Sequence, residues 1–423
     1  MVEADIQAPS TLPPAGKVAE ADIVVGIPSY NNSRTIGHVV RAVSAGLAKH
    51  FPEHRSVIIN SDGGSKDGTP QAVLEAEHET DKLLLVRHPM YPVHKITTPY
   101  NGLPGKGSAF RTIFETADRL NAKACAVVDS DLRSITPDWV DLLVRPVLQS
   151  NFDYVAPYYR RHKYDGTITN SIVYPLTRAL YGRQVRQPIG GEFGLSPKMW
   201  QRLLAKKEDW ETDVARFGID IWMTTTALAE GFSVCQVFLG AKLHDPKDPG
   251  ADLSAMLVQV VGALFGLMEE YEKNWHDVSG SVPAPLFGFP YAVGLEPIKV
   301  NPQKLVGNFQ QACKDLLGVY ASFLRADLVE ELKHLAELPP ENFHFPDETW
   351  VTLVFDFALA YHRRTIDRQH LLKSLTPLYI GRVASFVLDT LELDDQAAEE
   401  KIESLCLVYE QMKPYLTQRW AGK

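Results

Sequence analysis

A short apolar run that ends in two carboxylates is the feature that most constrains the fold of this chain. Residues 124–128 are Ala-Cys-Ala-Val-Val, and Asp129-Ser130-Asp131 follows directly. An apolar run of this length, bounded by polar residues, is typical of a strand buried on both faces of a parallel sheet. Side chains at positions i and i+2 of a strand lie on the same side, so both carboxylates can face one ligand. In open α/β sheets, ligands bind in the crevice beyond the carboxyl ends of the strands, which is where these two carboxylates lie.

The first third of the chain repeats the pattern of an apolar strand followed by a helix. We predict strands at 23–28, 56–60, 83–87 and 124–128, with helices after Ser33, from Pro70 and at 106–120. Successive βα units predict an α/β fold in which helices flank a Rossmann-like, mostly parallel sheet.

The rest of the chain becomes increasingly helical. We predict further strands at 152–157, 191–195 and 232–239, and helices at 168–180, 219–229, 253–271, 303–319, 324–337, 346–363, 370–390 and 395–415. Beyond about residue 250 we find no convincing strand, and a Pro/Gly-rich connection occupies 280–302. The predicted organisation is a flexible N-terminal arm (1–21), an α/β domain (22–275) and a C-terminal helical domain (276–423).

Composition excludes several classes of protein. The 423 residues are 45% hydrophobic and carry a net charge of −9, which argues against nucleic acid held by a broad basic surface. Four widely spaced cysteines without a Cys-x-x-Cys pair predict no zinc site and fit a reducing compartment. No apolar run approaches the roughly 18 residues of a membrane span, so we predict a cytoplasmic protein without one.

The two carboxylates at residues 129 and 131 suit a divalent cation. Mg²⁺ and Mn²⁺ prefer hard oxygen ligands and are often bound together with a substrate's phosphates. The alternative is an acidic turn with a helix cap, and an isolated Asp-x-Asp does not decide between the two. His244 lies just past a predicted strand and is a candidate third ligand, although a lone histidine is more often structural.

Polar residues and glycines also follow the first two strands. Pro28-Ser29-Tyr30-Asn31 ends the first strand, and Asp62 begins a glycine-rich turn after the second. Such segments can approach a base, ribose or phosphate closely, and Asp62 is a candidate acceptor for hydrogen bonds from a base or sugar. Plain turn chemistry is the alternative, because Asp-Gly and Gly-Gly are ordinary turn formers.

Gly105-Lys106-Gly107 opens a predicted helix. Helix N-terminal N–H groups favour an anion there, and the lysine adds a point charge. This is not a P-loop, because the residue after Lys106 is a glycine and the required glycine spacing is absent. An exposed glycine turn is the alternative.

Further candidates lie between residues 158 and 220. Glu192 follows Gly190-Gly191, whose small size lets the backbone approach a ligand, and it is a candidate for binding sugar hydroxyls. Asp220 lies near a helix N-terminus, where a dipole-stabilised cap is the alternative. The basic residues at 160–163 are either solvated surface or an anion site for a small acid acceptor.

Taken in order, these motifs resemble an A-type glycosyltransferase that uses a sugar nucleotide. More narrowly, the chain resembles the retaining mannosylglycerate and glucosyl-3-phosphoglycerate synthases over roughly residues 22–390. The two early strand-end motifs are generic for that superfamily. The combination of Asp129-Ser130-Asp131, Pro188–Glu192, Gly218–Asp220 and the strand-end His244 is much more specific. The resemblance implies the A-type glycosyltransferase fold, with residues 22–275 binding the nucleotide-sugar.

The resemblance also implies a role for each candidate residue. Asp131 and His244 would ligate Mg²⁺ or Mn²⁺, Asp129 would bridge to ribose or metal, and Asp62 would read the base. Glu192 and Asp220 would bind the transferred sugar. The implied catalytic residues are Asp131, Glu192, Asp220 and Lys106, and the implied metal ligands are Asp129, Asp131 and His244. The implied nucleotide-sugar site consists of Pro28, Tyr30, Asn31, Asp62, Gly105, Lys106, Asp129, Ser130, Glu192 and Asp220. The implied acceptor site consists of Arg160, Arg161, Thr169, Gly190 and Gly191.

The expected activity is transfer of glucose or mannose to the 2-hydroxyl of D-glycerate or 3-phosphoglycerate, with retention. UDP-glucose, GDP-mannose and GDP-glucose are the expected donors, and the product would be a glycosylglycerate-type compatible solute or its phosphate. The alternatives are a nucleotidyltransferase, a glycosyltransferase with another small or lipid acceptor, and a non-catalytic scaffold that binds sugar nucleotides. We expect the helical tail to serve packing and homo-oligomerisation.

Overall fold

The computed structural model describes residues 18–76, 94–99, 105–212, 214, 218–243, 253–291 and 293–420. Most of the predicted N-terminal arm, the predicted strand at 83–87 and His244 lie outside the described residues.

An eight-stranded sheet forms the centre of the α/β part, in the order β10-β8-β5-β7-β4-β1-β2-β3. All neighbouring strands are parallel except β7, which is antiparallel to both β4 and β5. The predicted mostly parallel sheet is therefore confirmed. Its strands are β1 (Ile23–Ser29), β2 (Ser56–Asp62), β3 (His94–Pro99), β4 (Ala124–Val127), β5 (Tyr154–Arg160), β7 (Phe193–Leu195), β8 (Val234–Ala241) and β10 (Leu286–Phe287).

β4 is apolar throughout and β1 is apolar as far as Pro28, as expected of strands that are buried on both faces. Val24 of β1 and Val127 of β4 belong to one hydrophobic cluster. Their neighbours Val25 and Val128 belong to a second cluster on the opposite face. The alternation of side chains along a strand thus divides each apolar run between two layers of helices.

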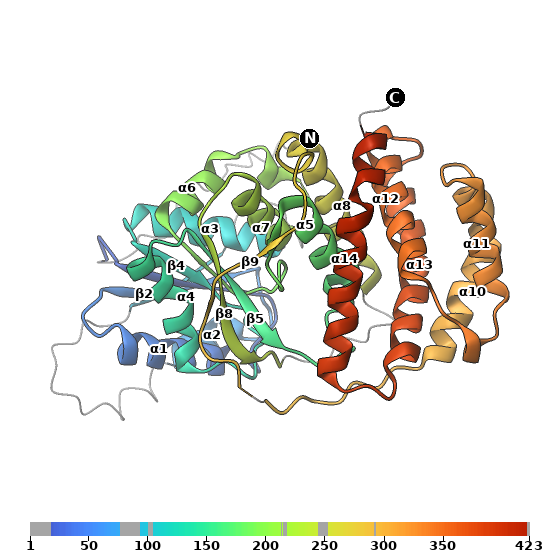
Figure 1. Ribbon diagram of the computed structural model, residues 1–423. Helices are drawn as coiled ribbons and strands as arrows, with labels where there is room; N and C mark the ends of the chain where they lie inside the picture. The colour runs from blue at the N-terminus through green and yellow to red at the C-terminus, as the bar shows by residue number, and fades with distance from the viewer. Residues whose placement is uncertain are drawn as a thin grey trace, which may run out of the picture.

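Helices cover both faces of the sheet (Figure 1). Residues of α1, α2 and α4 belong to one cluster, and residues of α3, α6 and α7 belong to the other. These helices are α1 (Ile36–His50), α2 (Thr69–Glu75), α3 (Lys106–Arg119), α4 (Pro137–Ser150), α6 (Pro197–Ala205) and α7 (Ile219–Ala229).

Two sequence predictions about strands are wrong. β3 occupies His94–Pro99, where we predicted no strand. Two-residue strands also occur beyond residue 250: β9 (Val282–Pro283) pairs with β6 (Arg183–Gln184), and β10 pairs with β8. Strands this short show no periodicity, and they form because an extended Pro-rich segment passes along existing strands.

The C-terminal helices form a separate group beside the α/β part, coloured orange to red in Figure 1. All five helices predicted there are confirmed, with bounds shifted by a few residues. They are α10 (Pro302–Tyr320), α11 (Ala326–Glu337), α12 (Asp347–Arg363), α13 (Arg368–Thr390) and α14 (Asp395–Trp420). α14 packs on α5 (Tyr174–Tyr181), and α13 packs on α8 (Leu253–Glu270). The boundary at residues 275 and 276 stays a prediction.

A proline explains one attachment between the two groups of helices. The helix predicted at 168–180 begins as a π-helical turn, Thr169–Val173, before α5 continues. Pro175 has no N–H for the carbonyl of Ser171 four residues earlier. That carbonyl instead accepts hydrogen bonds from Trp350 Nε1 at 2.9 Å and from Tyr409 Oη at 3.0 Å. Side chains from α12 and α14 therefore satisfy a backbone group that the local sequence leaves open.

Two helices in the described residues, α8 and α13, have the length and apolar composition of a membrane span. Both contribute buried side chains to the hydrophobic core, as the core helices of globular proteins also do. The observation is weak evidence for a span.

Candidate active site

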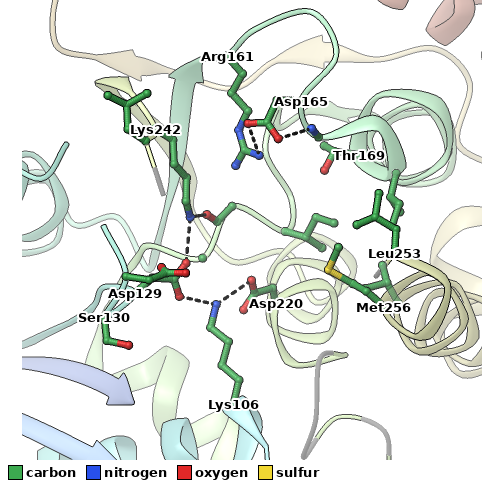
Figure 2. Close-up of a pocket in the computed structure, with 18 of the residues that line it drawn as sticks. Lys106, Asp129, Ser130, Arg161, Asp165, Thr169, Asp220, Lys242, Leu253 and Met256 are labelled. Carbon is green, nitrogen blue, oxygen red and sulfur yellow. Dashed lines mark hydrogen bonds and ion pairs between the residues drawn. The ribbon is translucent and has the colours of Figure 1, made fainter. Parts of the chain in front are cut away.

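A cleft of about 1160 Å³ opens beyond the carboxyl ends of β1 and β4, at the edge that the sequence predicted. The start of α3, the start of α7, the end of β8 and the loop 161–169 line it on the sheet side (Figure 2). Leu253 and Met256 of α8 and the segment 295–299 contribute the facing wall.

Five charged residues meet at the floor of this cleft, and we call Lys106, Asp129, Glu192, Asp220 and Lys242 the charge cluster. Lys106 Nζ lies 2.8 Å from Asp129 Oδ1 and 3.2 Å from Asp220 Oδ2. Lys242 Nζ lies 2.9 Å from Asp129 Oδ2 and 2.9 Å from Glu192 Oε1. Asp129 therefore accepts from one lysine on each of its oxygens, as Figure 2 shows.

Burial and mutual charge shift the pKa values of this cluster. Burial alone would lower the pKa of Lys106, but the charges of Asp129 and Asp220 raise it above its usual value. Burial alone would also lower the pKa of Lys242, but the charges of Asp129 and Glu192 raise it above its usual value. Burial would raise the pKa of Asp129, but the two lysines hold it well below its usual range. Both ammonium groups and the Asp129 carboxylate are thus charged at neutral pH.

The other two carboxylates are less well compensated. Burial raises the pKa of Glu192 and of Asp220 above their usual values. Glu192 is fully buried and accepts from the Tyr159 hydroxyl and from Lys242. Asp220 lines the cleft, and its Oδ1 atom is buried without a hydrogen-bond partner among the described residues. Three carboxylates face two ammonium groups here, so a cation or a hydroxyl donor in the cleft would complete the set.

Gly191 is required where Asp129 and Lys242 meet. Its φ is +95°, and a Cβ atom there would lie 2.2 Å from Asp129 Oδ2 and 2.9 Å from Lys242 Nζ. A side chain at this position would therefore force the ion pair apart. The paired glycines do allow a close approach of the backbone, but the group that approaches is the charge cluster of the protein itself.

Asp131 differs from Asp129 in its surroundings. It lines the cleft, and within the described residues its carboxylate has no hydrogen bond or ion pair. The intervening Ser130 is buried and donates to Asn32 Oδ1 at 2.9 Å, while its carbonyl accepts from Thr35 Oγ1 at 2.8 Å. The turn after β4 is thus fastened to the turn after β1, and Asp131 stays available to a ligand.

Some of the predicted nucleotide-sugar residues line the cleft, and others stabilise the turns beside it. Pro28, Tyr30 and Gly105 line the cleft, and Tyr30 is 62% exposed. Asn31 is not in the lining: its φ is +55°, and its Oδ1 accepts from the backbone N–H of Lys66.

Asp62 also stabilises a turn. It is buried, and its two oxygens accept four hydrogen bonds, from Ser29 Oγ, Gly64 N, Ser65 N and Ser65 Oγ. These bonds build the turn after β2. The placement gives no support to direct contact between Asp62 and a base.

The predicted acceptor residues lie on the other side of the charge cluster. Arg161, Thr169, Gly190 and Gly191 line the cleft, whereas Arg160 does not. Arg161 stacks over the Tyr159 ring at 5.4 Å and lies 3.6 Å from Asp165 Oδ2. Its Nε atom is buried and has no hydrogen-bond partner in the part of the chain that the structure describes, and burial lowers the pKa of its guanidinium. A buried guanidinium with a free N–H group is suited to a carboxylate or phosphate.

Comparison with known proteins decides the family. The domain family described as "Mannosylglycerate synthase, GT domain" matches residues 32–266, which is more than half of the chain. The chain belongs to this family. It is therefore a glycosyltransferase of the hexosyltransferase class. The match contains the charge cluster and the loop 161–169, and it ends within α8.

Solved structures add a more distant similarity. The glucosyl-3-phosphoglycerate synthase of Mycobacterium tuberculosis with Mn²⁺, UDP and glucosyl-3-phosphoglycerate is 21% identical, with a TM-score of 0.43, and the match covers 60% of this chain and 80% of that chain. The same enzyme with Mg²⁺ and UDP is 20% identical, with a TM-score of 0.43 and the same coverage. The search of curated proteins gave no significant match. The family assignment rests on the domain match.

One residue of this glycosyltransferase site was missed from the sequence. Lys242 follows the strand β8 and was given no role, although its ammonium joins Asp129, Glu192 and the Gly190 carbonyl. A signal was present, because a lysine directly after a buried strand needs charged partners. The apolar wall formed by Leu253 and Met256 gave no such signal, since a helix face of this kind also packs in a core.

Proposed function

We propose that this glycosyltransferase moves a hexose from a nucleoside-diphosphate sugar to the 2-hydroxyl of D-glycerate or 3-phosphoglycerate, with retention and with Mg²⁺ or Mn²⁺. One observation carries the proposal. A single cleft joins a side that suits a diphosphate and sugar, at Lys106, Asp131 and Asp220, to a side that suits a small acid, at Arg161 and Thr169.

On the donor side, Lys106 supports negative charge. Its ammonium lies at the start of α3, where helix N–H groups also favour an anion. Negative charge grows on the nucleoside diphosphate as the glycosidic bond breaks, and a preorganised cation nearby stabilises that charge. Tyr30 offers an exposed ring to a base at the mouth of the cleft. Asp220 Oδ1 has no hydrogen-bond partner among the described residues, and we propose that it accepts a hydrogen bond from a hydroxyl of the transferred sugar.

A divalent cation fits one carboxylate of the motif better than the other. Asp131 is a hard oxygen donor at the cleft and is unpaired as far as the described residues go. We propose it as a ligand together with His244, which lies outside those residues. When bound, the cation supplies Lewis-acid stabilisation to the diphosphate. Both oxygens of Asp129 already accept from lysines, so we propose that Asp129 positions Lys106 or contacts ribose.

Glu192 has a supporting role in this proposal. It is fully buried, is absent from the cleft lining and binds Lys242 and Tyr159. A direct contact with the sugar would require Lys242 to move. We therefore propose Asp220 as the carboxylate that faces the sugar.

On the acceptor side, Arg161 is the central group. Its planar guanidinium matches a carboxylate in geometry, and Thr169 adds a hydroxyl from the start of the π-helical turn. Of the basic residues at 160–163, only Arg161 and His162 line the cleft. Both acids remain proposed acceptors. Holding the acid beside the donor makes the transfer an effectively unimolecular step, which lowers its barrier.

A substrate panel tests the proposal. Purified protein is incubated with UDP-glucose, GDP-glucose or GDP-mannose and with D-glycerate or 3-phosphoglycerate, each with Mn²⁺, with Mg²⁺ or with EDTA. We expect nucleoside diphosphate to be released with at least one donor and acid pair and to fall to background with EDTA. Proton NMR of the product should show the anomeric configuration of the donor.

The matched control omits the acid acceptor and supplies glycerol instead, which lacks the carboxylate. Pyrophosphate as the released product would overturn the proposal in favour of nucleotidyl transfer. Equal turnover with glycerol and the acids would overturn the acceptor class, and an inverted product would overturn retention. Homo-oligomerisation and a cytoplasmic location stay predictions, and light scattering after size exclusion measures the first.

A further inference from the structure

One residue of the loop 161–169 points away from the cleft. Every other residue of this loop lines the cleft, from Arg161 to Thr169, but Lys163 does not. Its side chain extends to the end of α13 in the C-terminal helical region, more than 220 residues later in the chain. Lys163, one of the basic residues that the sequence offered as an anion site for a small acid acceptor, thus has another partner.

Lys163 binds the carbonyl end of a helix. Its Nζ donates to the carbonyl oxygens of Thr390 at 2.6 Å, Leu391 at 3.2 Å and Leu393 at 2.6 Å. The last carbonyls of a helix have no partner within it, and they carry the negative end of the helix dipole. An ammonium satisfies these groups and matches their charge. The backbone N–H of Lys163 also donates to Asp395 Oδ1 at the start of α14, at 3.1 Å.

Two neighbours fasten the same loop to α13. Thr167, which lines the cleft, shares a hydrogen bond with the buried Tyr379 hydroxyl. The Tyr164 hydroxyl donates to the carbonyl of Val387 at 3.5 Å. The loop is therefore bounded by the cleft on one side and by α13 and the α13–α14 turn on the other.

We propose that Lys163 is a positioning residue through which the C-terminal helices fix the loop 161–169 in the shape that binds the acceptor. This inference rests on the proposed function, in which Arg161 and Thr169 of this loop bind a small acid. A loop that is ordered before binding loses less conformational entropy when the acceptor arrives. The helical region thereby sets acceptor affinity without touching the acceptor.

The test compares Lys163→Met, which keeps most of the aliphatic stem, with Lys163→Arg, which keeps the charge. We expect Lys163→Met to raise KM for the acceptor about tenfold, as loss of charged hydrogen bonds predicts, with donor affinity changed less than about twofold. Lys163→Arg should restore most of the acceptor affinity. Tyr379→Phe removes only the hydroxyl at Thr167 and should shift the same parameter in the same direction.

Lys373→Met is the matched control. Lys373 is an exposed lysine of α13, the helix whose end Lys163 binds, and makes no hydrogen bond or ion pair within the described residues. Its replacement should leave both kinetic constants unchanged. Hydrogen exchange of free protein adds a readout independent of turnover, because peptides covering 161–169 should exchange faster in Lys163→Met while the central strands keep their protection.

Two results would overturn the inference. One is unchanged exchange of the loop together with an acceptor KM within about twofold of wild type. The other is an equal loss of donor and acceptor affinity, which would indicate a general structural effect. If the wild type transfers no hexose, the proposed function fails; faster exchange of the loop in Lys163→Met would still show that Lys163 orders it.

Discussion

At the residue scale, two aspartates of one short motif have different chemical environments. Asp129 is enclosed between two ammonium groups, whereas Asp131 faces the cleft without a partner in the described residues. The first is required to keep the lysines in place. The second is available for an ion or substrate that enters.

Asp131→Ala should lower kcat about 100-fold or more, because it removes the proposed ligand of the cation that would stabilise the charge growing on the leaving diphosphate. The unfolding free energy should change by less than about 0.5 kcal/mol, since the Asp131 carboxylate makes no hydrogen bond or ion pair with any residue that the structure describes. Steady-state kinetics across a Mn²⁺ titration and urea unfolding measure the two effects. Asp315→Ala, an exposed aspartate of α10, is the control. Full activity of Asp131→Ala without added metal would contradict the metal assignment.

Lys242→Met should lower the unfolding free energy by about 3 kcal/mol, because Asp129 and Glu192 lose a shared counter-charge within a buried site. Urea unfolding followed by circular dichroism measures the loss. Adding Glu192→Gln to the same chain removes one of the two carboxylates that lost Lys242 as a partner. This second change should restore part of the lost unfolding free energy. An equal loss from Lys242→Met in the Glu192→Gln background would show that the two side chains are not coupled.

At the element scale, one carboxylate joins the starts of three neighbouring strands. Asp22 precedes β1 and accepts from the backbone N–H of Arg55, before β2, at 2.9 Å. It also lies 2.9 Å from Lys123 Nζ, before β4. Burial alone would raise the pKa of Asp22, but the hydrogen bonds from Arg55 and Lys123 lower it far below 3.8.

Asp22→Asn should lower the unfolding free energy at pH 7 by about 2 kcal/mol, because a charged acceptor of several hydrogen bonds is lost. The unfolded chain binds a proton at Asp22 near pH 3.8, while the folded chain resists protonation until a lower pH. The stabilisation is therefore complete above about pH 4 and is lost as the pH falls further. Urea unfolding of both proteins at pH 7, 5, 4 and 3 measures the gap. A gap of constant size would contradict this role of Asp22.

The elements that the sequence predicted well are those with a long and regular pattern. α8 was expected at 253–271 and occupies Leu253–Glu270. α4 (Pro137–Ser150), β3 and β10 were not predicted. The two strands are short or Pro-rich and depend on a neighbouring strand for their hydrogen bonds. A two-residue strand exists only because β8 lies beside it, and local sequence does not contain that information.

At the scale of the whole molecule, one hydrophobic cluster crosses the predicted domain boundary. It contains Val24 of β1, Trp222 of α7, Phe309 of α10 and Trp420 of α14. A continuous core couples the stability of the parts that share it. The two predicted domains should therefore not unfold independently.

We expect a single unfolding transition, with the calorimetric enthalpy equal to the van't Hoff enthalpy. Far-UV circular dichroism and tryptophan fluorescence should give the same midpoint. Lys413→Met in α14 removes donors to the carbonyls of Trp275 and Val278, so it should lower both midpoints together. Two resolved transitions, with only one moved by this variant, would instead establish separate domains at the predicted boundary.

The sequence by itself determined the strand-end motifs, the periodic helices and the edge of the sheet where the site lies. Those features depend on residues close together in the chain, and local backbone geometry expresses them directly. Only the tertiary structure decided that Lys242 joins Asp129 to Glu192, that Asp62 supports a turn, and that Lys163 leaves the cleft for α13. These partners follow from the lateral order of the strands and from helices that return after more than 200 residues. A buried charge binds whichever opposite charge the fold places beside it, and that neighbour is set by packing rather than by local sequence.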